Sequence, residues 1–243
     1  QKTRSLLEEM HPGLHLYVKP GELARQFDAV SASIDRPLTP AQFLVKLAPP
    51  IESIRCGHTY LMPPPAQVQM SQRRGRLFPL PILFIEGVAV VDHKKASLPL
   101  GAVILAINDI SMEELAKQLQ PLVPCDGFVA SSRLTNLAVE FADAYAIALG
   151  QPRSFHVRYR LHGTEELLTR SLEPVDGRRL DELNETRFSY GGESYPLDFE
   201  HPRKDTVLMT INSLDFDDYR RGDGMFRSYL KRSFAAIARN PRV

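Results

Sequence analysis

One stretch near the middle of the chain constrains the fold most, because short apolar runs alternate there with turn signals and lead into a capped helix. FPLPILFIEGVAVVDH predicts two strands on either side of Gly87. LPLGAVILAINDIS predicts a third strand over residues 102–107, followed by a turn. Ser111 and Glu114 then stand at the spacing of a capping box, which starts a helix. Strands and helices in this order predict an α+β domain.

A longer helix and a hairpin are expected to complete the same domain. The helix is predicted over residues 132–149, and Gly150 and Pro152 end it. Its apolar positions recur at helical spacing: Leu134, Leu137, Ala138, Phe141, Tyr145 and Leu149. SFHVRYRLHG alternates polar and apolar residues, which predicts a strand. The following ELLTRSLEPV is expected to form a second strand that pairs with it. We therefore expect a domain over residues 76–175.

The N-terminal region, residues 1–72, has a helical pattern. Thr39 precedes a proline, which predicts an N-cap followed by proline at the first helical position. Pro49 and Pro50 are expected to kink or split the helix that follows, and Gly57 is placed to end it. The segment MPPPAQVQMSQRRGR, with prolines first and charges last, is typical of a linker.

The C-terminal part, residues 176–243, has a different texture. DGRRLDELNETRFSYGGES is polar and predicts loops, whereas DTVLMTINSL predicts a strand. An amphipathic helix is predicted over residues 223–238, with its charges facing water. Because one strand and one helix have little to pack against, this part is expected to be the opening of a third domain. The predicted class is α+β with several domains.

Charge and composition exclude some functions. The net charge is +1, from 30 basic and 29 acidic residues, so no nucleic-acid partner is expected. No apolar run approaches the length needed to span a bilayer. Cys56 and Cys125 could form one disulfide or remain thiols. No zinc-site spacing of Cys or His is present, so neither a metal nor a cofactor is expected.

Three kinds of segment follow one another along the chain. The first is helical and ends in CGHT; it comprises LLEEMHPGLHLY and PLTPAQFLVKLAPPIESI. The second is the strand and helix start LPLGAVILAINDISMEEL. The third is the strand DTVLMTINSL, followed by the helical FRSYLKRSFAAI. In this order they resemble the tail-specific serine peptidases, the family of C-terminal processing and tricorn-type proteases. The resemblance implies an N-terminal helical domain, a PDZ-like domain, and the opening strand and helix of an α/β peptidase core.

The resemblance also implies a function for the parent protein. It would be a serine endopeptidase that acts on peptides or proteins in the periplasm or outside the cell. The helix-borne serine nucleophile of that family is not among these 243 residues, so the chain alone is expected to be inactive. The chain begins at Gln1, for which removal of an export signal and trimming during cloning are both explanations. The alternative function is a non-catalytic peptide-binding or scaffolding protein built on the PDZ-like domain.

His58 is the candidate catalytic residue. In the tricorn-like branch the catalytic histidine lies in a motif of the CGHT kind, which implies that His58 is the general base. From the residues alone, a histidine that hydrogen-bonds the last carbonyls of a helix is the preferred interpretation. Relatives commonly have Asp where this chain has Cys56. Cys56 is not expected to be a nucleophile for His58, because side chains two residues apart rarely face each other correctly.

A PDZ-like domain binds an extended peptide by strand addition, with loop amides holding the terminal carboxylate. The resemblance places Phe78, Leu80 and Ile82 in the candidate peptide-binding groove. Pro79 and Pro81 have no N–H to offer a carboxylate, so a PDZ-like domain that acts only as a spacer stays an alternative.

The loop that precedes the predicted helix 132–149 holds two further polar pairs. Asp126 stands next to Gly127, and Ser131 stands next to Ser132. No base is adjacent to these serines in sequence, so a helix cap is the preferred interpretation of the loop.

Overall fold

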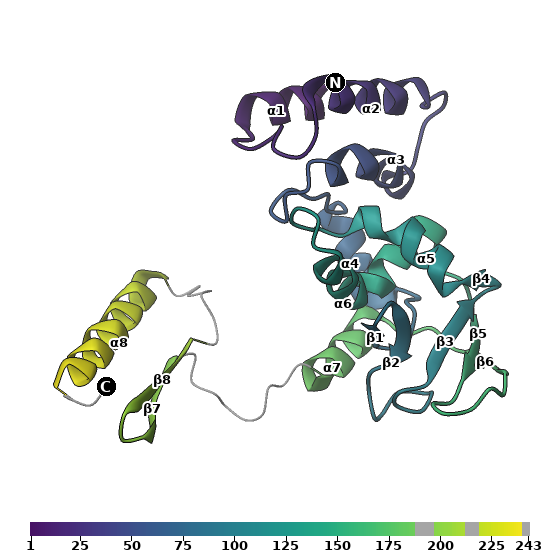
Figure 1. Cartoon of the computed structure of the whole chain (residues 1–243). Helices are drawn as coiled ribbons and strands as arrows, with labels where there is room; N and C mark the ends of the chain where they lie inside the picture. Colours follow the sequence, from purple (N-terminus) through teal and green to yellow (C-terminus); the bar gives the residue numbers. More distant parts are fainter. Residues whose placement is uncertain (188–196, 212–218, 240–243) are drawn as a thin grey trace. The chain divides into compact units, whose positions relative to one another are not determined.

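The computed structural model describes residues 1–187, 197–211 and 219–239. The chain forms two compact units, Gln1–Arg187 and Phe188–Val243, and each is described by itself. The described residues are mixed α/β, with α-helices and two antiparallel sheets, so the expected α+β class is confirmed (Figure 1). No helix in these ranges combines the length and the apolarity that a membrane span requires.

The first unit begins with three helices around a small core of their own. These are α1 (Lys2–Met10), α2 (Pro20–Ala32) and α3 (Pro40–Glu52). The predicted N-cap of α3 is confirmed, since Thr39 and Gln42 form a reciprocal capping box. The core residues of this part are Leu14, Val18, Leu23, Phe27, Leu47, Ile51 and Ile54.

The prolines in this region act differently from expectation. Helix α3 continues through Pro49 and Pro50 and ends at Glu52, so the two prolines do not split it. Each proline removes one N–H that would bond a carbonyl one turn earlier, and the helix extends only two residues beyond Pro50. The predicted linker instead contains α4 (Pro65–Arg74). Proline is well suited to the first turn of a helix, and this explains why a proline-rich entry did not prevent one.

A twisted antiparallel sheet forms the second part of this unit. Its strands are β1 (Ile82–Ile85), β2 (Val88–Val91), β3 (Val103–Ile107), β4 (Ile110–Ser111), β5 (Phe155–Arg160) and β6 (Leu168–Leu172). They pair in the order β1-β2-β3-β5-β6, and β4 pairs with β3.

Two tight turns connect these strands. Glu86 and Gly87 have φ of 51° and 83°, and Asn108 and Asp109 have φ of 48° and 66°. Two successive positive φ angles are the signature of the turn whose twist matches a hairpin. The predicted hairpin around Gly87 and the predicted turn after the third strand are both confirmed.

Helices pack against this sheet. They are α5 (Met112–Leu119), the 3₁₀ helix η1 (Gln120–Leu122) and α6 (Ala130–Leu149). Helix α5 contacts β3 and β4, and α6 contacts β1. The Ser111 hydroxyl accepts the Glu114 N–H at 3.2 Å, which confirms the cap of α5. Phe78 lies at the centre of the core, edge-to-face with Phe141 and Phe155.

The ends of the sheet domain meet. Leu77 and Val175 exchange two backbone hydrogen bonds of 2.8 and 3.1 Å. The chain then forms α7 (Gly177–Arg187), which packs against α4, where loops were expected. The Asp176 carboxylate accepts the Arg179 N–H and starts this helix. The apolar side of α7 consists of two buried residues, Leu180 and Leu183. The rest of the segment is polar, so the sequence carries no clear signal for a helix.

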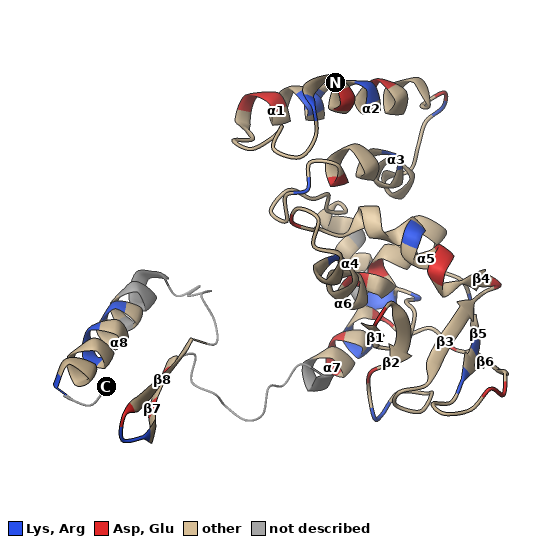
Figure 2. Cartoon of the chain, viewed as in Figure 1, with Lys and Arg blue, Asp and Glu red and all other residues tan. Residues whose placement is uncertain are grey.

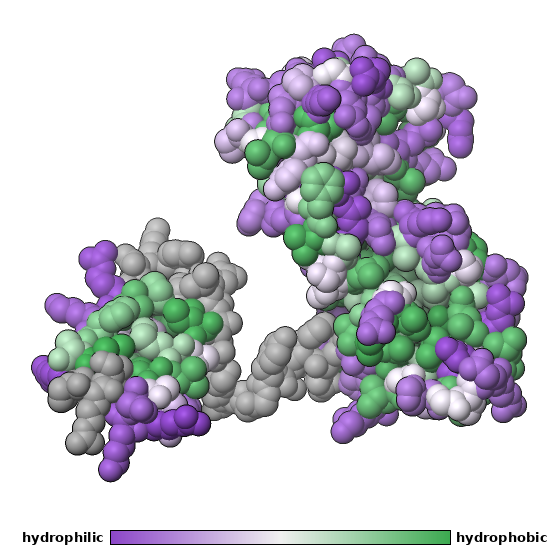
Figure 3. Space-filling view, in the orientation of Figure 1, coloured by the Kyte–Doolittle hydropathy of each residue, from purple (hydrophilic) through white to green (hydrophobic). Residues whose placement is uncertain are grey.

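The second unit contains a hairpin and a helix. Strand β8 (Thr206–Ile211) was predicted, whereas β7 (Leu197–Arg203) was not. Helix α8 (Tyr219–Arg239) is the predicted amphipathic helix. The Tyr229 hydroxyl donates to the Asp198 carbonyl at 2.5 Å and attaches the helix to the hairpin. Hydrophobic side chains gather on the visible face of this unit (Figure 3).

Charged residues of both signs alternate over the first unit, without a large region of one sign in this view (Figure 2).

Candidate functional site

The candidate site is the loop of residues 53–59 that follows α3. The helix ends with Ser53 as its C-cap, so Gly57 does not terminate it as predicted. The chain turns instead at Arg55, whose φ is 55°, and the Thr59 N–H donates to the Cys56 carbonyl at 2.9 Å. This second turn leaves the His58 side chain exposed at its tip.

A second loop, residues 125–129, holds the first loop in place. The Asp126 Oδ1 atom accepts the Gly57 N–H at 2.6 Å. The Gly127 N–H donates to the Arg55 carbonyl at 2.9 Å, and the Arg55 guanidinium donates back to the Gly127 carbonyl at 3.1 Å. Three hydrogen bonds thus join segments that are about 70 residues apart in sequence.

Both glycines of this double loop are required by close approach. A Cβ atom on Gly57 would lie 2.8 Å from the Asp126 Oδ2 atom, closer than non-bonded atoms come. Gly127 has a φ of 53°, and a Cβ atom there would lie 3.2 Å from the Tyr17 hydroxyl. Glycine at 57 therefore serves the contact with the second loop and not the end of a helix.

An aromatic cluster supports the same junction. The Arg55 guanidinium lies over the Phe128 ring, 4.2 Å from its centroid. The Tyr17 ring meets Phe128 edge-on, with centroids 5.6 Å apart. A guanidinium over an aromatic face is attracted by the ring quadrupole, so the charged side chain is held in place.

Three chemically different groups come together at this junction. The Cys56 thiol, the His58 imidazole and the Asp126 carboxylate each place one ligand atom within 4.8 Å of the other two. Cys56 is half-buried, whereas His58 and Asp126 are exposed. An acid thus lies beside the His58 loop although position 56 is not Asp. It comes from the second loop, which sequence spacing could not reveal.

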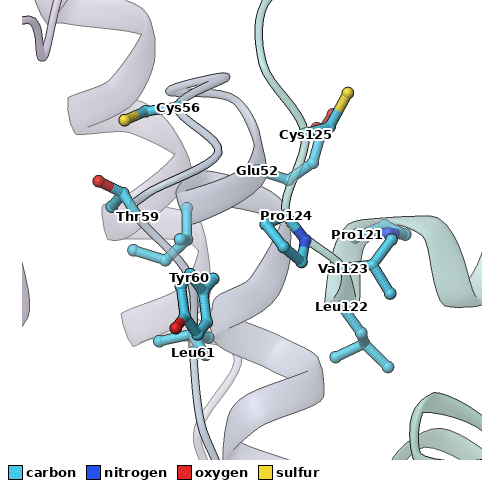
Figure 4. A pocket seen from close by; sticks show the side chains of 11 residues that line it. Glu52, Cys56, Thr59, Tyr60, Leu61, Pro121, Leu122, Val123, Pro124 and Cys125 are labelled. Atoms are coloured by element: carbon cyan, nitrogen blue, oxygen red, sulfur yellow. The ribbon is translucent and has the colours of Figure 1, made fainter. Parts of the chain in front are cut away.

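The two cysteines do not form a disulfide. Both are free thiols, half-buried at Cys56 and buried at Cys125. Their sulfur atoms point away from each other across the small cavity that both line (Figure 4). The Cys125 sulfur lies 3.6 Å from the Val129 carbonyl, so this thiol is used within its own loop.

The loop that leads into α6 does not act as a helix cap. The N-cap of α6 is Val129, with no side-chain hydrogen bond to the helix. The cap expected from Asp126, Ser131 or Ser132 is therefore absent. The Asp126 carboxylate is used by Gly57 instead. Residue spacing does not reveal this role, because the partner lies in another part of the fold.

Two histidines in the N-terminal part, His11 and His15, also have polar partners. The His11 Nε2 atom lies 3.0 Å from the hydroxyl of Thr59, the residue that follows His58. The His15 Nδ1 atom lies 3.2 Å from the Val18 carbonyl. His11 therefore steadies the far side of the candidate loop.

The candidate peptide-binding residues lie in the core. Phe78, Leu80 and Ile82 are 0%, 2% and 0% exposed. Their side chains fill the space between the sheet and α6, so a peptide could meet only the backbone here or more exposed neighbours such as Ile85. Their role in a groove stays a prediction.

A larger cavity, of about 460 Å³, begins two residues after His58. Residues 60–63 form one wall, and the other walls come from the η1 loop, α4, α6 and α7. Among its lining residues are Tyr60, Leu61, Leu77, Val123, Ala144 and Leu180. Such a size and largely apolar lining are typical of a ligand site.

Carboxylates of α6 also line this cavity. Burial raises the pKa of the Glu140 carboxyl, and repulsion from Asp143 adds to the effect. Burial likewise raises the pKa of Asp143, with repulsion from Asp181 of α7. Surrounding protein replaces part of the water around these groups, although each side chain still reaches solvent. The acids disfavour a bound carboxylate here.

No protein-family model matches this chain, and no curated protein is significantly similar to it.

Proposed function

We propose that this chain is the N-terminal region of a tail-specific-type serine endopeptidase, in which His58 is the general base. The observation that carries the proposal is the position of the exposed His58 imidazole on a braced loop, beside the Asp126 carboxylate. A base that takes a serine proton needs a fixed mount and a partner for the imidazolium that forms. The nucleophile would come from outside these 243 residues.

The mount is the double loop. Hydrogen bonds from Gly57 and Gly127 and the stacking of Arg55 restrict the segment on both sides of Cys56. The His11–Thr59 contact restricts the residue that follows His58. Restricting a catalytic side chain before the substrate arrives lowers the entropy that the reaction must lose.

The Asp126 carboxylate is placed to act on His58 through charge. One of its oxygen atoms lies within 4.8 Å of an imidazole nitrogen. Catalytic hydrogen bonds are often long in the absence of substrate and shorten in the reacting complex. One carboxylate oxygen accepts the Gly57 N–H, and a carboxylate has further lone pairs that can accept from the imidazole.

The test needs the full-length protein and a fluorogenic denatured-protein substrate. His58→Ala is expected to lower the rate of hydrolysis by about 100-fold or more. His162→Ala, in the exposed loop between β5 and β6, is the matched control and is expected to leave the rate unchanged. A His58→Ala enzyme with the parent rate would overturn the role of His58.

Fluorophosphonate labelling tests the location of the nucleophile separately. The full-length protein is expected to be labelled on one serine, and the 243-residue chain is expected to stay unlabelled. Covalent labelling of any serine within residues 1–243 would contradict the proposal.

Peptide binding without hydrolysis is the second candidate, and the position of β1 favours it. Strand β1 ends the described sheet order, and α6 packs beside it, the arrangement that strand addition uses. Calorimetry with peptides that differ in their C-terminal residue separates the two candidates. Tight binding by a full-length protein that hydrolyses nothing would favour the second.

A further inference from the structure

The donor set at Cys56, His58 and Asp126 is suited to a metal ion. A thiol, an imidazole and a carboxylate converge there, each with one donor atom within 4.8 Å of the other two. Two of the donors are two residues apart in one loop, and the third comes from the loop around Asp126. Sequence spacing predicted no metal site, because this third ligand lies far from the other two along the chain.

The upper limit on the three separations, 4.8 Å, is compatible with a tetrahedral site. Zinc bonds of about 2.0–2.3 Å to O, N and S place neighbouring ligand atoms roughly 3.3–3.7 Å apart. Because no separation in the cluster exceeds 4.8 Å, no edge needs to contract by more than about 1.5 Å. His58 and Asp126 are exposed, so rotation about their side-chain bonds can supply this contraction without moving the core.

The backbone around the cluster is already ordered for such a role. The Gly57 N–H binds Asp126 Oδ1 at 2.6 Å and orients the carboxylate. A carboxylate has several lone pairs, so the same group can accept this hydrogen bond and also bind a cation. Hydrogen bonds that orient a ligand in this way strengthen metal sites.

The kinds of donor select the metal. Ca²⁺ and Mg²⁺ prefer sites made only of oxygen atoms, and a thiolate does not suit them. A thiolate with an imidazole suits Zn²⁺, and carboxylate is a common third ligand of this ion. Three protein ligands leave a fourth position for water or for a group of a bound molecule.

We propose that Cys56, His58 and Asp126 bind one Zn²⁺ ion at the junction of the two loops. The site does not depend on peptidase activity. An effect on activity rests on the proposed function: if His58 is the general base, zinc and the proton of the nucleophile compete for the same imidazole. Zinc would then hold the enzyme in an inactive form.

Cobalt provides a direct test on the metal-free 243-residue chain. Titration with Co²⁺ is expected to saturate at one ion per chain and to produce a thiolate-to-cobalt charge-transfer band. Zn²⁺ is expected to displace Co²⁺ and abolish the band. Cys56→Ser is expected to abolish the band, whereas Cys125→Ser, which changes the buried thiol outside the cluster, is expected to keep it.

The other two ligands are tested by affinity. His58→Gln and Asp126→Asn are each expected to weaken Zn²⁺ binding by about 10-fold or more in calorimetry. An asparagine side chain keeps an oxygen that can accept the Gly57 N–H, so the second substitution removes the charge and preserves the loop contact. His162→Gln is the matched histidine control. Circular dichroism of each metal-free variant confirms that it is folded.

The outcomes separate this proposal from the proposed function. A band that survives Cys56→Ser, a band that disappears in folded Cys125→Ser, or the absence of saturable binding by the folded parent chain would overturn the zinc site. None of these results would bear on His58 as a base, since no peptide is involved. Conversely, a His58→Ala enzyme that keeps the parent rate of hydrolysis would overturn the base and leave the cobalt result standing.

Discussion

The Asp126 carboxylate accepts the backbone N–H of Gly57 at 2.6 Å, across 69 residues of sequence. This bond joins the helical N-terminal part of the first unit to the loop before α6. The position of His58 is therefore determined by a residue of the sheet-containing part and not by α3 alone. Whatever moves residues 125–129 is expected to move the candidate base as well.

The first prediction concerns the space at Gly57. Gly57→Ala is expected to destabilise the first unit by about 1–3 kcal/mol, because the new methyl group would lie 2.8 Å from the Asp126 carboxylate and force the loops apart. Thermal and urea unfolding measure the change.

Gly21→Ala provides the control for that substitution. Gly21 lies in the first turn of α2, and a Cβ atom there would meet only the end of the Arg25 side chain, at 3.7 Å. This variant is expected to be neutral or more stable by up to about 1 kcal/mol. Equal destabilisation by both alanines would show that crowding at Asp126 is not the cause.

The second prediction concerns the ion pair between α3 and α6. Glu52 and Arg133 are 2.5 Å apart, and their side chains are only 16% and 18% exposed. Glu52→Gln or Arg133→Gln is expected to cost about 1–3 kcal/mol, because each leaves a half-buried charge without its counterion. A double-mutant cycle in urea unfolding measures the coupling, which is expected to exceed about 0.5 kcal/mol.

An exposed ion pair on α5 is the control for this cycle. Glu113 and Lys117 are 3.8 Å apart, and both side chains are largely exposed. Glu113→Gln is expected to change stability by less than about 0.5 kcal/mol, since water screens the pair. A coupling energy between Glu52 and Arg133 below about 0.5 kcal/mol would show that burial does not strengthen their ion pair.

The fold followed from the sequence wherever local chemistry decided it. The turns at Gly87 and Asn108 need residues that tolerate positive φ, and the caps at Thr39 and Ser111 need a hydroxyl. These signals lie within four residues of the turn or helix end that they create, so each can be predicted from its own short segment. Helices α4 and α7 were missed because their sequences are polar or rich in proline and tertiary packing stabilises them.

The candidate site could be predicted only in part. CGHT drew attention to His58, but nothing in the sequence indicated that Asp126 would lie beside it. Contacts between distant loops depend on how helices and sheet dock, and residue spacing does not carry that information. For the same reason Gly57 was interpreted as a helix end, although close approach of a carboxylate is what requires a glycine there.

The third prediction concerns pH and the acids of the large cavity. The ordinary pKa values are 4.5 for Glu140 and 3.8 for Asp143, and burial raises both in the folded chain. Below these values both states are protonated and the acids contribute nothing. As pH rises above them, the unfolded chain ionises first, so stability is lost until the folded carboxyls ionise too.

Neutral substitutions are expected to remove that loss. Glu140→Gln with Asp143→Asn should be more stable than the parent chain near neutral pH by up to about 1 kcal/mol, a small gain because solvent reaches both groups. The difference should vanish at a pH of about 3. Urea unfolding across this range measures it, and Glu166→Gln in the exposed β5–β6 loop is the control. A difference that stays constant with pH would rule out ionisation as the cause.

The fourth prediction concerns the second unit. Tyr229 is buried, and its hydroxyl donates to the Asp198 carbonyl at 2.5 Å with the Thr210 carbonyl at 3.4 Å, so one side chain joins α8 to both strands of the hairpin. Tyr229→Phe keeps the ring but leaves these carbonyls without the hydroxyl, and it is expected to cost about 0.5–1.5 kcal/mol. Amide hydrogen exchange in β7 and β8 should accelerate by about 2- to 12-fold, the same energy expressed as a rate. Exchange in β1–β6 provides the internal control, because those strands belong to the other unit. Unchanged exchange in β7 and β8 would show that packing of the ring, and not the hydroxyl, holds the helix on the hairpin.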